Sequence, residues 1–508
     1  MAPKGSQPPD AKFLPALDPI NRKSMKSGLI TLGAVGENER PETSVIESSN
    51  FQFDAIGSAT PRKGLTRLGS QLSGSILGTY YFVDTVNIAS PKSQFVTVNG
   101  TALYYLNGST FTSFRSGLTA GSKARFTTFL NFLWMVNQTE ATAIWDGNTG
   151  GSFVTTGNAN GAPKGQFIEN FRSRVWIMGD ATYPSRLFYS SIPSAVATPV
   201  VSWSTDPVTG TQWIDISPQD GDLPTGLQRF RNVLLVFKTN RLYRVFDIGQ
   251  VDPDPYYAVG TSSQESVIET KAGVFFHHSS GFYQYNIYGV VQEISRPVLD
   301  FIRAIPTSSY PKVAGWLEPD GDHIVWAIGT VTVRGTTYTN CELRFTISTQ
   351  CWTQYNRPHE FLTTIRRQPF YTDGTTQFAI GGDDAGNVYK INVGKTDDGT
   401  PIPCSLIHRW DNMDGLLSTR KNIMTANFAH IGGAMMNVAW QNEDNDPDAL
   451  NDWSKKVGQL KTINTGFNSV GAKGRKIRFR IFGQSSGEPF FYDGYELVGV
   501  QHEIIQFT

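Results

Sequence analysis

Short apolar runs, each followed by a polar turn and a second apolar run, recur along the middle of the chain. The two clearest runs, 171–178 and 230–237, both begin with Phe-Arg and continue with residues such as Val, Leu, Ile and Trp. Runs of this length and composition, bounded by Gly, Pro, Asn and Asp, are typical of β-strands. Two such runs joined by a tight turn predict a β-hairpin, and the shared Phe-Arg opening indicates an internal repeat.

The repeat predicts the fold class. Apolar runs of the same kind begin near residues 95, 129, 171, 230, 273, 323 and 377. A period of about 40–50 residues with several strands in each unit is typical of a β-propeller. We therefore expect an all-β protein with a β-propeller of about seven blades, an N-terminal arm and a C-terminal β-sandwich-like domain, and the count leaves about six or eight blades open.

Composition divides the chain into three parts. Residues 1–45 are rich in Pro, Ser and Lys with few apolar side chains, so we expect an extended arm that is flexible or lies along another chain. Residues 46–404 carry the repeats and form the predicted propeller, and a strand from residues 50–85 is expected to close its last blade, because a propeller joins its two ends. Residues 405–508 change in character and are expected to form a separate C-terminal β domain.

The charge balance limits the function classes. The 508 residues include 44 basic and 44 acidic side chains, so the formal net charge is zero. A dedicated nucleic-acid binder is usually basic overall, so the chain does not fit that class, although a local basic patch stays open. A near-neutral protein lacks the repulsion that keeps copies apart, so we expect a large assembly. No run of eighteen apolar residues occurs, and no membrane-spanning segment is predicted.

No motif in the chain predicts catalysis, a metal or a cofactor. His277 and His278 are neighbours on a predicted strand, so they point to opposite faces and do not form one metal site. Residues 483–487 match Gly-x-Ser-x-Gly, but a strand is expected where a nucleophile elbow needs a helix, which favours a hairpin turn. Asp383 and Asp384 lack the spacing of a calcium loop and are expected in a turn. The cysteines are expected to be buried thiols, and a pairing of the first two stays open: Cys341, Cys351 and Cys404.

Basic residues gather in three segments, 62–67, 366–367 and 473–480, and the first and last are candidates for contact with DNA in a channel or with a neighbouring subunit. Phosphate contacts require Lys or Arg but no particular motif. Residues 477–481 alternate apolar side chains with Arg, which predicts a strand with one basic face. A solvated surface is the alternative interpretation of each segment. The candidate residues are Arg62, Lys63, Arg67, Lys473, Arg475, Lys476, Arg478 and Arg480.

Three segments in a fixed order carry a family resemblance. The first is Asn-Phe-Gln-Phe-Asp at 50–54, followed by Pro-Arg-Lys-Gly-Leu-Thr at 61–66. The second is Asp-Gly-Asp-Leu-Pro-Thr-Gly at 220–226, shortly before a Phe-Arg run. The third is Gly-Arg-Lys-Ile-Arg-Phe-Arg-Ile-Phe at 474–482, followed by Tyr-Asp-Gly-Tyr-Glu-Leu-Val-Gly-Val at 492–500. Together they resemble the tail nozzle or tail hub proteins of short-tailed bacteriophages, also called head-to-tail stabilisation or tail accessory proteins.

The resemblance covers roughly residues 45–240 and 405–508 and implies a structural role. A member of this family is a virion protein of the phage tail, assembled in the host cytoplasm, and is not an enzyme. Six copies would form a ring below the portal and the head-to-tail adaptor, retain the packaged DNA, conduct it during ejection without sequence specificity and seat tail spikes or fibres. Residues 1–45 would clasp a neighbouring subunit, and residues 446–457 would plug or line the lumen.

Two other functions fit a propeller. A glycan-binding propeller, such as a receptor-binding adhesin, would present exposed aromatic side chains with Asp or Asn in its loops, and Tyr183, Trp203 and Trp213 are the candidates. A propeller glycosidase would need two carboxylates that converge in a pocket. The sequence does not place such a pair, because every predicted blade supplies acidic loop residues.

Overall fold

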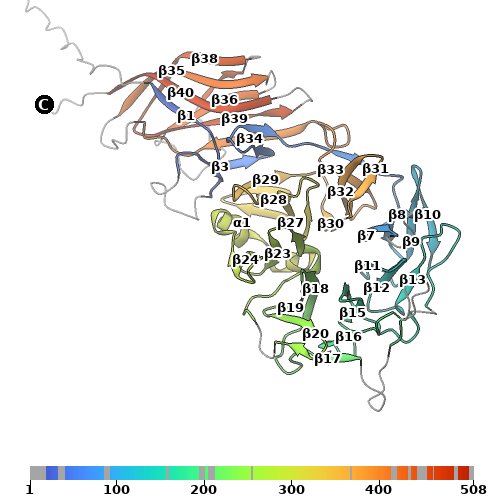
Figure 1. The fold of residues 1–508 in the computed structure, drawn as a ribbon. Coiled ribbons are helices and arrows are strands. Elements are labelled where there is room, and N and C mark those ends of the chain that lie inside the picture. Colours follow the sequence, from blue (N-terminus) through green and yellow to red (C-terminus); the bar gives the residue numbers. More distant parts are fainter. Residues whose placement is uncertain are drawn as a thin grey trace, which may run out of the picture.

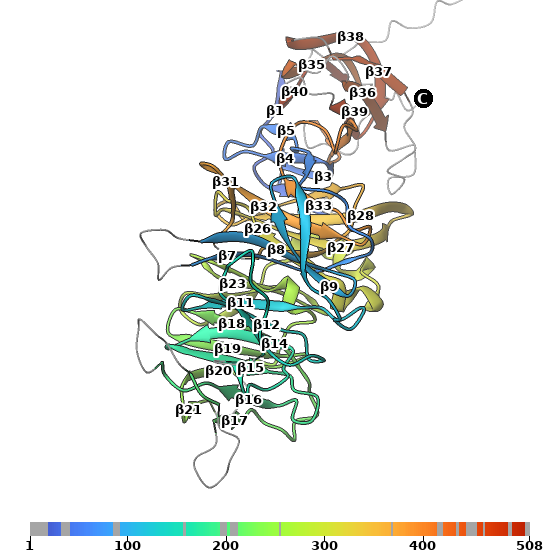
Figure 2. The same ribbon diagram turned by 90° about the vertical axis from the view of Figure 1, so that its right-hand side faces the viewer.

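The protein is almost entirely β-structure and consists of two bodies placed end to end (Figure 1, Figure 2). We call the larger, which holds residues 65–391, the repeat body, and the smaller, which combines residues 20–61 and 402–502, the two-sheet body. The computed structural model describes residues 19–31, 41–84, 92–155, 159–193, 201–203, 212–252, 256–366, 369–413, 420–432, 436–442, 455–460, 463–485 and 490–502.

Seven small antiparallel sheets follow one another in the described part of the repeat body. The apolar runs predicted from the sequence are the second strands of these sheets. The strands, sheet by sheet, are β7 (Ile76–Val83), β8 (Ser93–Asn99), β9 (Ala102–Asn107) and β10 (Thr110–Arg115); β11 (Arg125–Phe129), β12 (Phe132–Val136) and β13 (Ala143–Trp145); β14 (Phe167–Phe171), β15 (Arg174–Met178), β16 (Arg186–Tyr189) and β17 (Trp213–Asp215); β18 (Pro224–Phe230), β19 (Val233–Lys238), β20 (Leu242–Asp247) and β21 (Gln250–Val251); β22 (Ile268–Thr270), β23 (Gly273–His278), β24 (Gly281–Asn286) and β25 (Val291–Glu293); β26 (Ala314–Leu317), β27 (His323–Val333), β28 (Thr336–Thr346) and β29 (Cys351–Asn356); and β30 (Phe361–Thr364), β31 (Tyr371–Asp373), β32 (Thr376–Asp383) and β33 (Val388–Ile391).

The second strands are covered on both faces, which explains their continuous apolar sequence. In β15, Val175, Trp176, Ile177 and Met178 are all fully buried. Successive side chains of a strand point to opposite faces, and accordingly Trp176 and Met178 join one apolar cluster whereas Val175 and Ile177 join another. A sheet that is buried on both sides carries apolar runs without polar alternation.

The first strands of the seven sheets form a ring, which is seen face on in Figure 1. Neighbouring first strands contact each other in two parts of the ring. In one part β7 contacts β11, β11 contacts β14 and β14 contacts β18; in the other part β22 contacts β26, β26 contacts β30 and β30 contacts β7. Between β18 and β22 the short 3-10 helix η3 (Gln264–Ser266) contacts β18. The side-chain amide of Gln264 accepts from the Leu227 N–H at 2.6 Å and donates to the Leu227 carbonyl at 3.0 Å, as a neighbouring strand would. The repeat body is therefore propeller-like.

A strand from the N-terminal side completes the last sheet of the ring. The strand β6 (Leu65–Arg67) pairs with β33, with Thr66 opposite Lys390. This pairing confirms the prediction that a strand from residues 50–85 closes the ring, and it leaves one sheet edge fewer exposed. The chain enters β6 through Gly64, where a Cβ atom would lie 1.8 Å from the Thr396 carbonyl oxygen, so only glycine fits there.

Two sheets packed face to face form the other body. An apolar cluster that includes Phe428 and Tyr495 of one sheet and Phe479 of the other fills the space between them. The first sheet contains β1 (Ile20–Lys23), β4 (Phe51–Phe53), β5 (Ala59–Pro61), β35 (Lys421–Gly432), β38 (Ile463–Gly474) and β40 (Phe490–His502). The second contains β2 (Gly28–Leu29), β3 (Ser44–Ser49), β34 (Ile402–His408), β36 (Met436–Asn442), β37 (Lys455–Gln459) and β39 (Ile477–Ser485).

One sheet runs through both bodies. The strand β3 pairs antiparallel with β34 and meets β29 of the repeat body in parallel, with Ser49 opposite Gln354. The sheet from β26 to β29 thereby continues through β3 into β34, β39, β36 and β37, ten strands in all with β2. The two bodies are therefore joined by backbone pairing at one position, where the Asn50 N–H also donates to the Gln354 carbonyl at 2.9 Å, as well as by the chain connections.

The N-terminal segment lies on its own chain, whereas the sequence predicted an arm that is flexible or laid along another chain. The strand β1 pairs with β40, and β2 pairs in parallel with β3. The segment is held by burial, since Met25 is 2% and Leu29 1% exposed. The expected domain boundaries also differ from the structure, because residues 44–61 pair with C-terminal strands and β34 begins at Ile402. Residues 1–18 and 32–40 lie outside the described part of the chain.

Helices contribute little. The α-helix α1 (Leu299–Ala304) lies between the 3-10 helices η4 (Arg296–Val298) and η5 (Thr307–Lys312) and buries Phe301 and Ile302 against the core. None of the helices in the described ranges is long and apolar enough to cross a membrane.

Candidate functional site

The structure does not bring the eight predicted basic residues together at one surface. Arg62 is fully buried and forms an ion pair with Asp397 at 2.6 Å. Its Nε also donates to Asn50 Oδ1 at 2.7 Å, so it fixes the junction between the two bodies. Arg478 is fully buried as well, lies over the Trp410 ring and donates to the Gln441 side chain at 2.8 Å. Neither arginine contacts DNA or another subunit in this fold, because neither reaches the surface.

The other predicted basic residues are nearer to the surface. Lys63 and Arg67 are exposed, and Arg67 is paired with Asp398 at 3.1 Å. Arg480 is half-buried and donates to Ser405 Oγ at 3.0 Å in a hollow of about 510 Å³ at the junction. Arg475 is exposed and Lys476 half-buried, whereas the side chain of Lys473 lies outside what the structure describes. The alternation predicted for residues 477–481 is present, since Ile477, Phe479 and Ile481 enter the core, but the opposite face is not a basic surface because Arg478 is buried there.

The repeated Phe-Arg pairs lie at one end of the ring. Phe171 and Phe230 end β14 and β18 and are buried, and each guanidinium of the following Arg172 and Arg231 lies over its ring, at 5.6 and 5.4 Å. Arg172 and Arg231 have φ angles of 48° and 55°. Residues other than glycine seldom adopt positive φ, and such positions cluster at functional sites. The sequence predicted the strands around these pairs, but it did not place the arginines side by side.

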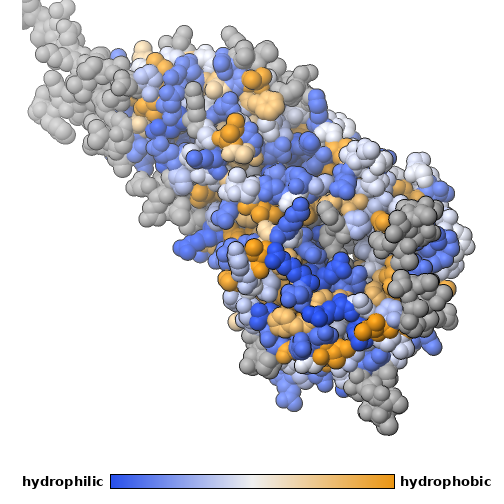
Figure 3. Space-filling view, viewed as in Figure 1, coloured by the Kyte–Doolittle hydropathy of each residue, from blue (hydrophilic) through white to orange (hydrophobic). Residues whose placement is uncertain are grey.

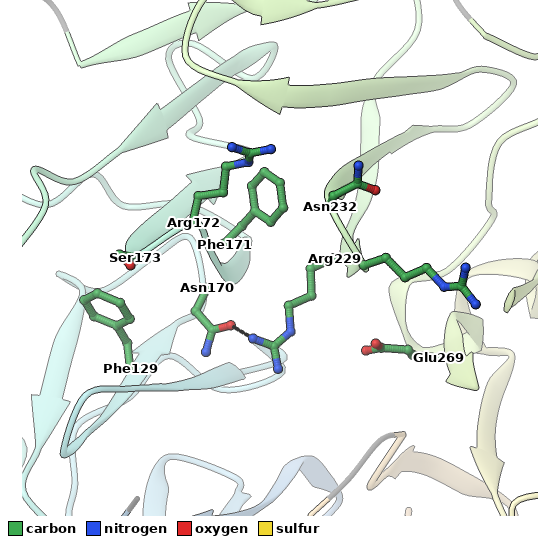
Figure 4. Close-up of a pocket in the computed structure, with 9 residues that line it drawn as sticks. Phe129, Asn170, Phe171, Arg172, Ser173, Arg229, Asn232 and Glu269 are labelled. Atoms are coloured by element: carbon green, nitrogen blue, oxygen red, sulfur yellow. Dashed lines mark hydrogen bonds between the residues drawn. The ribbon is translucent and has the colours of Figure 1, made fainter. Parts of the chain in front are cut away.

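These turns line a hollow of about 650 Å³, which we call the basic rim (Figure 4). Arg229 donates to the Asn170 side chain, and Arg172 pairs with Asp247 at 3.2 Å. Both members of the second pair are about 40% exposed, so that pair contributes little to stability. Guanidinium groups outnumber carboxylates in a lining made of Phe129, Asn170, Phe171, Arg172, Ser173, Arg229, Arg231, Asn232 and Glu269. Figure 3 shows hydrophilic side chains gathered over the middle of the repeat body in that view. The rim can hold an acidic group of a partner.

The residues considered for catalysis or metal binding are buried in the core or hydrogen-bonded within turns. His277 is fully buried and His278 half-buried on opposite faces of β23, and burial lowers the pKa of His277 to about 3. Asp383 accepts the Ala385 and Asn387 N–H groups of a hairpin turn, at 3.0 and 2.7 Å. The cysteines are free and buried, and burial raises the pKa of their thiols, in the case of Cys404 to about 12.

The sequence patterns did not predict one group of possible metal ligands. Glu318, Asp320 and His323 offer ligand atoms within 4.8 Å of one another. Glu318 already accepts from Arg344 at 3.3 Å and from Asn392 at 2.8 Å, and His323 Nδ1 lies 2.5 Å from Asp320. This hydrogen bond and the His323 charge outweigh burial and hold the pKa of Asp320 below its usual value. The two carboxylates of the group are therefore already bound by side chains of the protein itself.

The aromatic candidates for glycan binding are engaged by the protein itself. The Arg186 guanidinium lies between the rings of Tyr183 and Trp213, at 3.9 and 4.6 Å from their centres. Trp203 packs against Trp134 with ring centres 6.2 Å apart. A sugar would need an open aromatic face, so these contacts do not favour a glycan site.

Comparison with known proteins places the chain in no family. No family model matches it, and no curated protein matches its sequence. The solved structures that match include the computationally designed Ika8 protein, with a TM-score of 0.37, 12% identity and coverage of 65% of this chain and 100% of that chain. They also include the WD40 domain of Neurospora crassa Pan2, with a TM-score of 0.40, 7% identity and coverage of 65% of this chain and 95% of that chain. At these scores the similarity carries no argument about function.

Proposed function

We propose that the chain is a structural subunit of a bacteriophage tail, a nozzle or hub protein with a seven-bladed propeller and a β-sandwich-like second domain. Copies assemble into a ring, six by the family resemblance, below the portal and the head-to-tail adaptor. Packaged DNA is held by this ring, passes through it during ejection without sequence specificity, and spikes or fibres attach to its outside.

The observation that carries the proposal is the sheet shared by the two bodies. A subunit that holds packaged DNA is expected to keep its two bodies from moving freely against each other. Here β3 is hydrogen-bonded on both sides, and the buried Arg62–Asp397 pair lies beside it. Separating the bodies would expose this charge pair and break the backbone pairing of Ser49 with Gln354, both of which are costly.

The basic residues take different parts in this proposal. Arg62 and Arg478 stabilise the subunit and are not lumen residues. The exposed side chains of Lys63, Arg67 and Arg475 stay candidates for contact with DNA or a neighbouring subunit. The basic rim is a further docking surface, suited to an acidic segment of a neighbouring tail protein.

Two segments of the proposal lie outside the described residues. The clasp by an N-terminal arm now concerns residues 1–18, because β1 and β2 lie on their own chain. The lumen plug concerns residues 446–454, since β37 begins at Lys455. Deletion of residues 1–18 tests the clasp: rings that form as before would contradict it. Deletion of residues 446–454 tests the plug: unchanged DNA retention would contradict it.

The mass of the purified protein tests the assembly. We expect light scattering, alone or with the adaptor ring present, to give a particle of about six times the 56.1 kDa chain mass. A chain that stays monomeric and never joins the adaptor would overturn the proposal, and a glycan screen would then follow.

A further inference from the structure

A second hollow lies at the end of the ring opposite to the basic rim. The first strands of the sheets run in one direction, so β11 and β14 begin at Arg125 and Phe167 in this hollow and end at Phe129 and Phe171 in the rim. The hollow has a volume of about 720 Å³. Its described lining contains Lys123, Arg125 and Lys312 and many hydroxyl groups, and includes no Asp or Glu. We call it the cationic pocket.

Buried charged groups lie directly below the pocket. Arg125 Nε donates to Glu265 at 3.1 Å, and Arg366 Nε lies 3.6 Å from the other oxygen of the same carboxylate. Burial raises the pKa of Glu265, but Arg366, Arg125 and Lys123 outweigh it and hold the pKa below its usual value. Both oxygens of the Glu265 carboxylate are therefore engaged by guanidinium groups, one by Arg125 and the other by Arg366.

Lys123 is the third cation, and its ammonium group has no hydrogen-bond partner among the described residues. The Nζ atom is buried although it lines the pocket. Burial lowers the pKa of Lys123, and Arg125, Arg366 and Lys312 lower it further against the opposing effect of Glu265. A buried ammonium group without an acceptor is unfavourable, and an oxyanion bound in the pocket would supply the missing acceptor.

We propose that the cationic pocket binds a small molecule that carries an oxyanion, either a phosphate group or the carboxylate of an acidic sugar. Lys123 pairs with the oxyanion, Arg125 adds long-range attraction, and hydroxyl groups such as those of Ser122, Thr225 and Ser262 bind the polar remainder. The volume is that of a site for one small molecule. This inference does not depend on the assembly of several copies of the chain into an oligomeric ring.

Calorimetric titration of the full chain tests the proposal with three probes: inorganic phosphate, glucuronate and glucose. We expect at least one of the two anions to bind at millimolar concentration or below and glucose to bind at least tenfold more weakly. Binding of phosphate alone would identify the source as phosphate esters, and binding of glucuronate alone would identify it as acidic sugars. Absence of binding by both anions, or equal binding of glucose, would overturn the proposal.

Substitution of the unpaired cation supplies the matched control. The variant Lys123→Met removes an unsatisfied buried charge at similar volume, so it should fold at least as well as the parent and lose tenfold or more in affinity for the anion. The variant Lys271→Met removes an exposed cation at the far end of the ring and should leave the affinity unchanged. Equal affinity of the parent and Lys123→Met, with both folded by near-ultraviolet circular dichroism, would overturn the assignment of Lys123.

Discussion

The repeat body and the two-sheet body are both built from strands, but they close in different ways. In the repeat body each sheet is made by strands that are close in sequence, apart from β3 and β6. In the two-sheet body the defining pairs join distant segments, such as β1 with β40 and β3 with β34. Local pairings can form as the chain is made, whereas the distant ones require the C-terminal strands. The difference shows that the N-terminal strands serve both bodies.

The largest effect is expected at the junction of the two bodies. The variant Arg62→Ala leaves the carboxylate of Asp397 buried without its partner, and should lower the free energy of unfolding by about 3–5 kcal/mol. Arg67→Ala, which breaks the exposed pair with Asp398, is the control and should cost about 1 kcal/mol or less. Urea denaturation measures both, and equal effects of the two variants would refute the role of the buried pair.

A smaller loss is expected where η3 replaces a strand in the ring. The variant Gln264→Met leaves the Leu227 N–H and carbonyl without partners and should lower the free energy of unfolding by about 2–4 kcal/mol. The exposed Gln292, which donates to Gln284, offers a matched control, and Gln292→Met should stay within about 0.5 kcal/mol. If thermal denaturation shows that Gln264→Met and Gln292→Met lower the free energy of unfolding equally, the pairing of the Gln264 side chain with Leu227 does not close the ring of strands.

Each body contains a histidine that is buried in its neutral form, which predicts a loss of stability in mild acid. Burial lowers the pKa of His277 to about 3 and of His408 to about 4, from 6.5. The unfolded chain therefore binds a proton below about pH 6.5 that the folded chain does not, so this stability is present above pH 6.5 and is lost as the pH falls. From pH 7 to 5 each histidine should cost about 2 kcal/mol.

The variants His277→Gln and His408→Gln separate the two contributions to the pH dependence. Each should reduce the difference in unfolding free energy between pH 7 and 5 by about 2 kcal/mol, whatever its effect at pH 7. Below about pH 4 the slope due to His408 should flatten while that due to His277 continues to its pKa of about 3. A pH profile that neither variant changes would mean that the buried histidines are protonated in the fold.

The smallest effect is expected at the basic rim. Glycine tolerates the φ of 55° found at Arg231, so Arg231→Gly should raise the free energy of unfolding by about 0.5–1 kcal/mol. Arg229→Gly, in the extended strand β18, should lower it by a similar amount. Loss of stability in both variants would show that the Arg231 turn is unstrained.

Sequence patterns predicted the repeat body well because its information is local. The Phe-Arg runs and the alternation of strands and turns follow from periods and turn residues within one unit, and the closing strand follows from the need of a propeller to join its two ends. The N-terminal strands were missed because isolated apolar residues such as Met25 and Leu29 show no period, and their partners are distant in sequence. Strand pairing over that distance is set by packing rather than by local preference.

The candidate sites were harder to predict for the same reason. Charge alone does not separate a surface cation from a buried one, so Arg62 and Arg478 were grouped with exposed Lys63 and Arg67. The cationic pocket was not foreseen, because Lys123 precedes β11 whereas Lys312 ends η5, and the two residues come together only in the folded chain. The Phe-Arg repeat did hold a usable signal, since a repeated cation in a tight turn marks the same end of two neighbouring sheets, those that begin with β14 and β18.

Calorimetric unfolding of the full chain tests the shared sheet most directly. The variants Trp176→Ala in the repeat body and Phe428→Ala in the two-sheet body each remove a large buried side chain, at a cost of about 3–5 kcal/mol. If β3 joins the bodies into one cooperative unit, the parent unfolds in one transition, and either variant lowers the midpoint of that whole transition. Two transitions, each lowered by only one of the variants, would show that the bodies unfold independently and would contradict the account.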